Sequence, residues 1–141
     1  MQDLAGELRT DNLISPANVP LATTVVTNSN MYRSMSKYRK GLVVITAYLS
    51  DSKTAIGQLT CASDSSGTGK TNVSGKTVTL TGATLARNQV GSIEFDVFDL
   101  DLTNNKYYVG VDITTNQNGD DIAAILIRGA ARYFEGSSMG M

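Results

Sequence analysis

Residues 105–133 read NKYYVGVDITTNQNGDDIAAILIRGAARY and contain two strand-length apolar runs separated by a polar turn. In the first run, every second residue from Tyr107 to Ile113 is apolar, which is the period-two pattern of a strand with one buried face. The second run, Ile122–Ile127, is apolar at every position, as in a strand at the middle of a packed sheet. With the turn Asn116–Asp121 between them, the two runs predict a hairpin at the core of a β-rich domain.

The composition fits one such domain. The chain has 141 residues, and single domains typically contain about 100–150. Charged residues make up 18% of the chain, below the usual ~25%. Threonine, serine and asparagine are spread through the apolar runs, which favours strands with polar outer faces around a single core.

Strand signals recur from Ala22 onward at the short spacing typical of sandwiches and barrels. In one of them, Val78 and Leu80 are expected to face the core while the threonines beside them face outward. No stretch alternates strands with long helical patterns, which argues against a parallel α/β sheet. About eight strands are predicted: Thr23–Thr27, Met31–Met35, Gly41–Ser50, Ala55–Ala62, Lys76–Thr81, Gly91–Phe98, Lys106–Thr115 and Ile122–Arg128.

The apolar alternation changes parity within residues 93–102. It passes from the set Ile93, Phe95 and Val97 to the set Phe98, Leu100 and Leu102. A one-residue shift moves every side chain to the other face of a strand, so a bulge or corner is required near residues 97–98. Such corners carry the chain between the two sheets of a sandwich.

The first 21 residues are expected to form an extended arm. Leu4 and Leu8 are spaced for one helical turn, but Pro16 and Pro20 prevent a longer helix. We interpret the segment as one that becomes ordered on a partner or neighbouring subunit; the alternative is a frayed terminus without a role. The predicted organisation is an N-terminal arm (1–21), a β-sandwich domain (22–134) and a C-terminal tail (135–141).

Several classes of function are disfavoured. The chain has no histidine and one cysteine, Cys61, which argues against zinc sites and against Ser-His or Cys-His catalysis. Cys61 alternates with Leu59 and is expected to be a small buried residue. A net charge of −1 lacks the basic field that nucleic acid binding needs. No segment has the length of a signal peptide core or a membrane span, so synthesis and residence in the cytosol are expected, or export only as part of a larger assembly. We predict no enzyme activity, no cofactor and no metal.

Residues 64–71, DSSGTGKT, resemble a phosphate-binding loop with one substitution, because Asp64 occupies the position of the first glycine. A phosphate-binding loop must also open a helix, whereas another β pattern follows here. The segment Ser63–Gly75 is therefore predicted to be a flexible solvent loop.

Four acids, Glu94, Asp96, Asp99 and Asp101, form a row. A metal or a glycosidase-type acid pair would need ligand spacings that the row does not supply, so solvated or interface charge is the preferred interpretation.

Arg33, Lys37, Arg39 and Lys40 form a basic cluster with tyrosines interleaved. The open interpretations are a solvated sheet edge, a docking site for an acidic protein surface, or a nucleic acid site, the last disfavoured by the overall acidity.

The order of these elements resembles that of small virion proteins of tailed bacteriophages, most closely the capsid decoration or cement proteins. The likeness spans roughly residues 16–133. It rests on the polar arm, the run SMSKYRKGLVVI (34–45), the Gly/Ser-rich loop, FDV with DLD (95–97 and 99–101) and the run AILIRGAARY (124–133).

The resemblance implies an antiparallel β-sandwich or jelly roll, commonly trimeric, that sits on the capsid exterior and clamps neighbouring major capsid subunits. It implies synthesis in the host cytoplasm and partners that are the major capsid protein and other copies of this chain, with no nucleic acid or membrane. Candidate interface residues are Leu4, Leu8, Arg9, Arg33, Lys37, Arg39, Lys40, Met139 and Met141, because arms wrap large surfaces and methionines fill irregular niches.

Three alternatives stay open at this stage. The first is a tail, neck or head-fibre component, and the second is a carbohydrate- or receptor-binding sandwich. The third is an enzyme that uses the Glu94, Asp96 and Asp99 carboxylates. The absence of tryptophan and an aromatic content of 6% leave few residues for stacking on a sugar.

Overall fold

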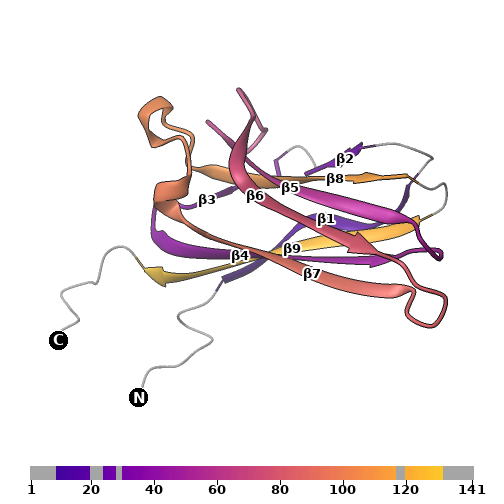
Figure 1. Ribbon diagram of the computed structural model, residues 1–141. Coiled ribbons are helices and arrows are strands. Elements are labelled where there is room, and N and C mark those ends of the chain that lie inside the picture. The colour runs from indigo at the N-terminus through magenta and orange to yellow at the C-terminus, as the bar shows by residue number, and fades with distance from the viewer. Residues whose placement is uncertain (1–8, 20–23, 28–29, 117–119, 132–141) are drawn as a thin grey trace, which may run out of the picture.

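A computed structural model describes residues 9–19, 24–27, 30–116 and 120–131. They form two antiparallel sheets stacked as a sandwich (Figure 1). The first sheet, here called sheet A, has the strand order β1 (Arg9–Val19), β9 (Asp120–Ala131), β4 (Tyr38–Tyr48) and β7 (Asn88–Asp96). Sheet B has the order β2 (Thr24–Val26), β8 (Tyr108–Thr115), β5 (Thr54–Ala62) and β6 (Thr71–Thr81), and the short β3 (Arg33–Ser34) also pairs with β8.

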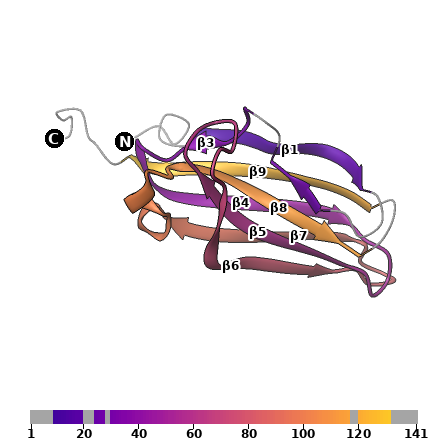
Figure 2. The same cartoon turned by 90° about the horizontal axis from the view of Figure 1, so that it is seen from above.

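The strand pairs are nested along the chain. β5 pairs with β6, β4 with β7, β2 and β3 with β8, and β1 with β9. A long hairpin of four strand pairs has thus been rolled up, and the β4–β9 and β5–β8 pairings close the roll into two sheets (Figure 2). This is the jelly-roll arrangement, and it confirms the predicted all-β antiparallel sandwich.

The core lies between the inner faces of the two sheets. Val43 and Ile45 of β4 and Leu126 of β9 are buried there against Leu59 of β5 and Val111 of β8. The predicted hairpin within residues 105–133 is wrong: β8 and β9 are consecutive strands, but they do not pair with each other and belong to different sheets. β9 lies between β1 and β4, as predicted for a central strand, with its inner face buried and its outer face half-buried.

Part of the expected arm belongs to the sandwich. Strand β1 spans Arg9–Val19, so the boundary predicted at residue 22 is corrected for these residues. The pairing of β1 with β9 is irregular between Asn12 and Ile14, and Leu13 and Ile14 are both buried. A bulge of this kind breaks the period-two pattern by which strands are recognised. Residues 1–8, most of the remaining arm, lie outside the described residues, as does the tail 135–141.

The loop predicted for Ser63–Gly75 is shorter than expected, because β6 already begins at Thr71. In residues 63–70 the Asp64 carboxylate accepts hydrogen bonds from the backbone N–H groups of Ser66 and Thr68 at 2.9 and 3.1 Å. The pairing of β5 with β6 then shifts register after Gln58, where residues 73–76 of β6 form a bulge.

The predicted corner follows β7. A 3₁₀ turn, η1 (Val97–Asp99), and a second, η2 (Leu102–Asn104), carry the chain from sheet A to sheet B. Leu100 is buried as expected, but Phe98 is 65% exposed, so its predicted inward orientation is wrong. The turn replaces a strand here, and a turn does not alternate its side chains between two faces. Among the described residues, no helix is long and apolar enough to cross a membrane.

Candidate functional site

Cationic side chains gather at the end of the sandwich where β1 and β4 begin and β9 ends. This surface, here called the basic end, contains Arg9, Arg33, Lys37, Arg39, Lys40 and Arg128. Two carboxylates balance them: Arg9, Arg33 and Arg128 share Asp11, and Arg39 and Lys40 share Asp96. The basic end therefore carries a positive charge in a chain whose net charge is −1.

Arg128 anchors the basic end to the core. Its Nη2 lies 2.6 Å from Oδ2 of Asp11, and its Nη1 donates to the backbone oxygen of Ser34 at 2.7 Å. The guanidinium also lies over the ring of Tyr38, 4.7 Å from the ring centre, within the range of a cation–π contact. Arg128 thus joins β1, β3 and β4 at the basic end.

Asp96 organises the other half of the basic end. Its Oδ1 accepts the backbone N–H of Phe98 at 3.0 Å, and its Oδ2 lies 3.2 Å from Nζ of Lys40 and 3.5 Å from Nε of Arg39. The hydrogen bond from Phe98, followed by Lys40 and Arg39, lowers the pKa of the Asp96 carboxyl below its ordinary value. Asp96 is also the N-cap of η1, so the corner and the charge cluster depend on one carboxylate.

Five of the predicted interface residues lie at this end: Arg9, Arg33, Lys37, Arg39 and Lys40. Arg9 lies in β1 instead of an arm. Leu4, Leu8, Met139 and Met141 lie outside the described residues. Sequence analysis did not identify Arg128 as a site residue, although it keeps the parity of the buried Leu126 and is therefore directed inward.

The outer face of sheet A is apolar at its centre. Leu42 pairs with Ile127, and Val44 pairs with Ile125, on the adjacent strands β4 and β9. These four side chains and that of Ala123 are half-buried on this outward face, and Val90 of β7 is 67% exposed. A depression of about 620 Å³ hollows the end of the face nearest the basic end, with Leu42, Glu94, Ile127 and Gly129 among its lining residues.

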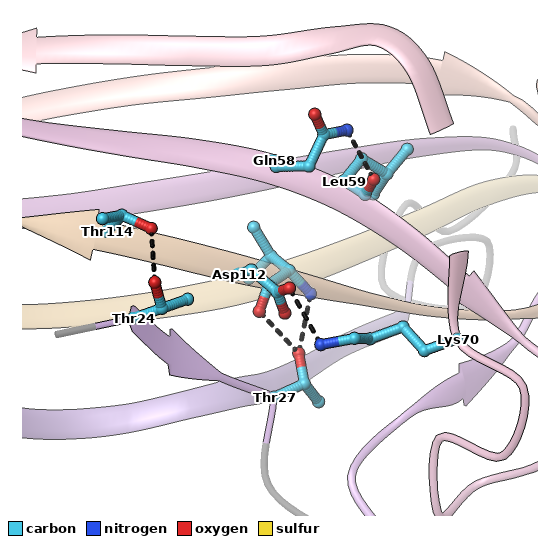
Figure 3. Close-up of polar contacts among 8 residues, drawn as sticks. Thr24, Thr27, Gln58, Leu59, Lys70, Asp112 and Thr114 are labelled. Carbon is cyan, nitrogen blue, oxygen red and sulfur yellow. Dashed lines mark hydrogen bonds and ion pairs between the residues drawn. The ribbon is translucent and has the colours of Figure 1, made fainter. Parts of the chain in front are cut away.

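The outer face of sheet B is mostly polar by contrast, although Val26 and Ile56 are 41% and 44% exposed there. The hydroxyls of Thr24 and Thr114 lie 2.7 Å apart, and Nζ of Lys70 lies 2.9 Å from Oδ2 of Asp112 (Figure 3). The hydroxyl of Thr27 accepts the backbone N–H of Val111 at 2.7 Å. Polar side chains that bond to one another make this face suited to solvent.

The Tyr32 ring lies over the sheet B face against Gly110, and burial raises the pKa of its hydroxyl. The tyrosine thereby covers the backbone of β8 at a position where there is no side chain.

The acids of the row from Glu94 to Asp101 do not form one cluster, because Asp96, Asp99 and Asp101 each bind different neighbouring groups. Oδ2 of Asp99 accepts the N–H of Asp96 at 2.8 Å and lies 3.6 Å from Nζ of Lys76, while Asp101 lies 3.8 Å from Lys106. No group of three or more acidic or cysteine side chains capable of holding a metal occurs among the described residues. Cys61 is buried in the core, as predicted.

The described part of the chain shows two exposed aromatic side chains, Tyr48 and Phe98. Tyr48 ends β4, whereas Phe98 follows β7 near the start of β4, so they lie at opposite ends of sheet A. They do not form a common platform on which a sugar ring would stack.

Comparison with known proteins supports the fold. No protein-family model and no curated protein sequence matches the chain. Among solved structures, the PBSX exported protein XepA is similar with a TM-score of 0.55 and 10% identity, over 94% of this chain and 40% of that one. Cowpea mosaic virus empty particles give a TM-score of 0.51 at 8% identity, over 86% of this chain and 83% of that one. The structure of infectious bursal disease virus Gx strain gives a TM-score of 0.53 at 8% identity, over 86% of this chain and 31% of that one.

The chain therefore spans less than half the length of the XepA and bursal disease virus chains that it matches. At such identities the likeness concerns the fold alone. This chain is a jelly-roll β-sandwich of the kind found in those virus particles and in the XepA protein.

Proposed function

We propose that this protein is a structural virion protein that binds the outside of a bacteriophage capsid and stabilises the shell by clamping neighbouring major capsid subunits. The observation that carries the proposal is the basic end. Five cations share two carboxylates there, and Arg9, Arg39 and Lys40 are each at least 60% exposed. The jelly-roll fold, shared with the virus particles compared above, adds support.

A rigid, positively charged end suits docking on an acidic protein surface. Electrostatic complementarity raises association rates and fixes the orientation of the partners, and it suppresses contacts with the wrong surface. Arg128 and Asp11 hold the end in one conformation, which reduces the entropy lost on docking. The proposed partners are the major capsid protein and further copies of this chain.

A matched pair of charge variants tests the docking surface. Lys37→Glu with Arg39→Glu reverses two cations at the basic end, and Lys53→Glu with Arg87→Glu reverses two exposed cations at the opposite end with the same change in net charge. We expect the first variant to lose at least tenfold in affinity for purified shells that lack this protein, and the second to bind nearly as the wild type does. Equal binding by all three proteins would overturn the assignment of the basic end.

Copy number separates decoration from a tail, neck or head-fibre role. Quantitative mass spectrometry of purified virions is expected to find this protein in numbers comparable to the major shell subunit. A handful of copies per particle would favour the tail, neck or fibre alternative, and none would reject a virion role. Binding to a glycan array would instead favour the carbohydrate-binding alternative.

A further inference from the structure

The outer face of sheet A is the surface whose chemistry the capsid proposal does not use. Its apolar side chains lie on three adjacent strands: Leu42 and Val44 on β4, Val90 on β7, and Ala123, Ile125 and Ile127 on β9. Polar residues flank them, Thr10 and Asn12 on β1 and Ser92 and Glu94 on β7. An apolar centre inside a polar rim is the anatomy of a protein interface.

Among the described residues, the outer face of sheet B has no comparable continuous apolar patch. On the outer face of sheet B the exposed apolar side chains Val26 and Ile56 lie on different strands and are separated by Asp112 and Thr114 of β8. Gln58 and the contact between Lys70 and Asp112 add to the polar character of this face (Figure 3). A two-layer sandwich needs only one buried face per sheet, yet β9 is apolar on both faces. The outer face of sheet A therefore has the composition of a surface that another layer covers.

We propose that a second copy of this chain covers the face, so that two sandwiches pack sheet A to sheet A about a twofold axis that runs along the line between β4 and β9. A twofold interface must be self-complementary, and the pairing across this line has that property. Leu42 lies opposite Ile127, and Val44 lies opposite Ile125. Rotation about the line places each of these side chains over its apolar counterpart in the second copy.

The rim agrees with the same axis. Glu94 and Thr10 flank the Leu42–Ile127 pair on opposite sides, so the carboxylate of one copy faces the hydroxyl of the other. Lys40 pairs with Gly129, so its aliphatic stem enters the depression that Gly129 lines in the second copy. A twofold axis perpendicular to the strands would instead place Glu94 over the apolar Val90, which disfavours that arrangement.

The size of the face sets the strength of the contact. β4 and β7 pair over nine residues, from Lys40 to Tyr48, and four strands at the usual spacing give a face of about 30 Å by 19 Å. Pairing would bury about 1,200 Å² in total, the lower limit for a stable interface. A dimer that dissociates at micromolar concentration is expected. The resemblance to decoration proteins implies a trimer, whereas this contact is twofold.

Sedimentation equilibrium of the full chain, without shells, tests the proposal independently of capsid binding. Over about 1–200 µM, the wild type is expected to change from monomer to dimer. Ile125→Glu places a charge at the centre of the face and is expected to remain monomeric. The matched control Ile56→Glu alters a 44% exposed isoleucine on β5 of sheet B and is expected to dimerise as the wild type does.

Circular dichroism establishes whether each variant is folded. Should Ile125→Glu unfold, Ile125→Thr is the second variant, because it keeps the β-branched shape. It is expected to weaken dimerisation at least tenfold, since both copies in the dimer lose apolar contact area. A wild type that stays monomeric at the highest concentration, a trimer, or an Ile125 variant that dimerises with unchanged affinity would overturn the proposal.

Discussion

Arg128 and Asp11 meet across the neighbouring strands β9 and β1, with Nη2 and Oδ2 2.6 Å apart and only 10% and 11% of their side chains exposed. Asp11 also lies 3.7 Å from Arg9 and from Arg33, so one carboxylate is shared by three guanidinium groups. The Nε atoms of Arg33 and Arg128 are buried without a hydrogen-bond partner. The balance of charge at this end of the core therefore depends on Asp11 more than on any one arginine.

The first prediction follows from that imbalance. Asp11→Asn leaves three cations without a carboxylate, and loss of one partner of a buried ion pair costs about 3–5 kcal/mol. Arg128→Met is expected to cost less, because its apolar side chain replaces the packed stem and Asp11 retains Arg9 and Arg33. Urea denaturation measures both free energies of unfolding. Equal losses, or a larger loss in Arg128→Met, would show that Asp11 is not the critical member.

The fold was predictable from sequence wherever strands alternate regularly. The core positions of β8, the outward threonines of β6 and the corner after β7 were all expected, because each rests on a local pattern that the sheet enforces. β1 was not expected, since its bulge buries Leu13 and Ile14 in succession and Pro16 interrupts its pattern. Pairing with β9, more than 100 residues along the chain, overrides these local signals.

The candidate site was predictable only in part for a related reason. The exposed cations around residue 37 form a visible cluster in the sequence, but Asp11 and Arg128 are separated by 117 positions. Their meeting depends on the register between β1 and β9, the first and last of the described strands. The apolar outer face was similarly hidden, because a run such as Ile122–Ile127 does not reveal whether its second face is covered by the same chain or by another.

A second prediction concerns the close packing of β4 against β7. A side chain at Gly41 would overlap the ring of Phe95, which is buried at 3% exposure. Gly41→Ala is therefore expected to lower the free energy of unfolding by about 1–3 kcal/mol, the usual cost of overpacking a core. In a Phe95→Leu background the same substitution should cost distinctly less, since the obstructing ring is gone. Additive losses in the double variant would contradict this account.

A third prediction concerns Gln58, which stabilises the bulge in β6. Its Nε2 donates to the backbone oxygens of Leu59, Val73 and Lys76 at 2.8, 2.9 and 3.3 Å (Figure 3 shows the first of these). Gln58→Leu removes the donor and leaves these oxygens unsatisfied, at an expected cost of about 1–3 kcal/mol.

Gln89→Leu is the matched control for Gln58. The Nε2 of Gln89 donates at 2.6 Å to the backbone oxygen of Ala86 in an exposed hairpin, where water replaces the lost bond. The unfolding midpoint of the Gln89→Leu variant in urea is expected to stay close to that of the wild type. If the two leucine variants lose similar stability, the network around Gln58 is not what holds the bulge.

The last prediction is a pH dependence at Asp96. Its folded-state pKa lies below the ordinary value, chiefly because of the Phe98 hydrogen bond and then Lys40 and Arg39. A carboxyl with a depressed pKa contributes stability that is present above its ordinary pKa and is lost as the pH falls through the folded-state pKa. Asp96→Asn keeps an oxygen for the N-cap but lacks the charge, so it isolates this contribution.

Thermal unfolding of the wild type and Asp96→Asn between pH 3 and pH 7 measures the effect. At pH 5–7 the variant is expected to melt about 1–4 °C below the wild type, because exposed ion pairs contribute little. This gap in melting temperature should begin to narrow as the pH falls below the ordinary carboxyl pKa of about 4. It should narrow further as the pH falls through the lower folded-state pKa of Asp96, because the carboxyl is then protonated and loses its attraction for Lys40 and Arg39. High salt should narrow the gap at neutral pH by screening the ion pairs. A gap that persists undiminished at pH 3 would mean that Asp96 acts through its shape as an N-cap, and that its charge contributes nothing to the basic end.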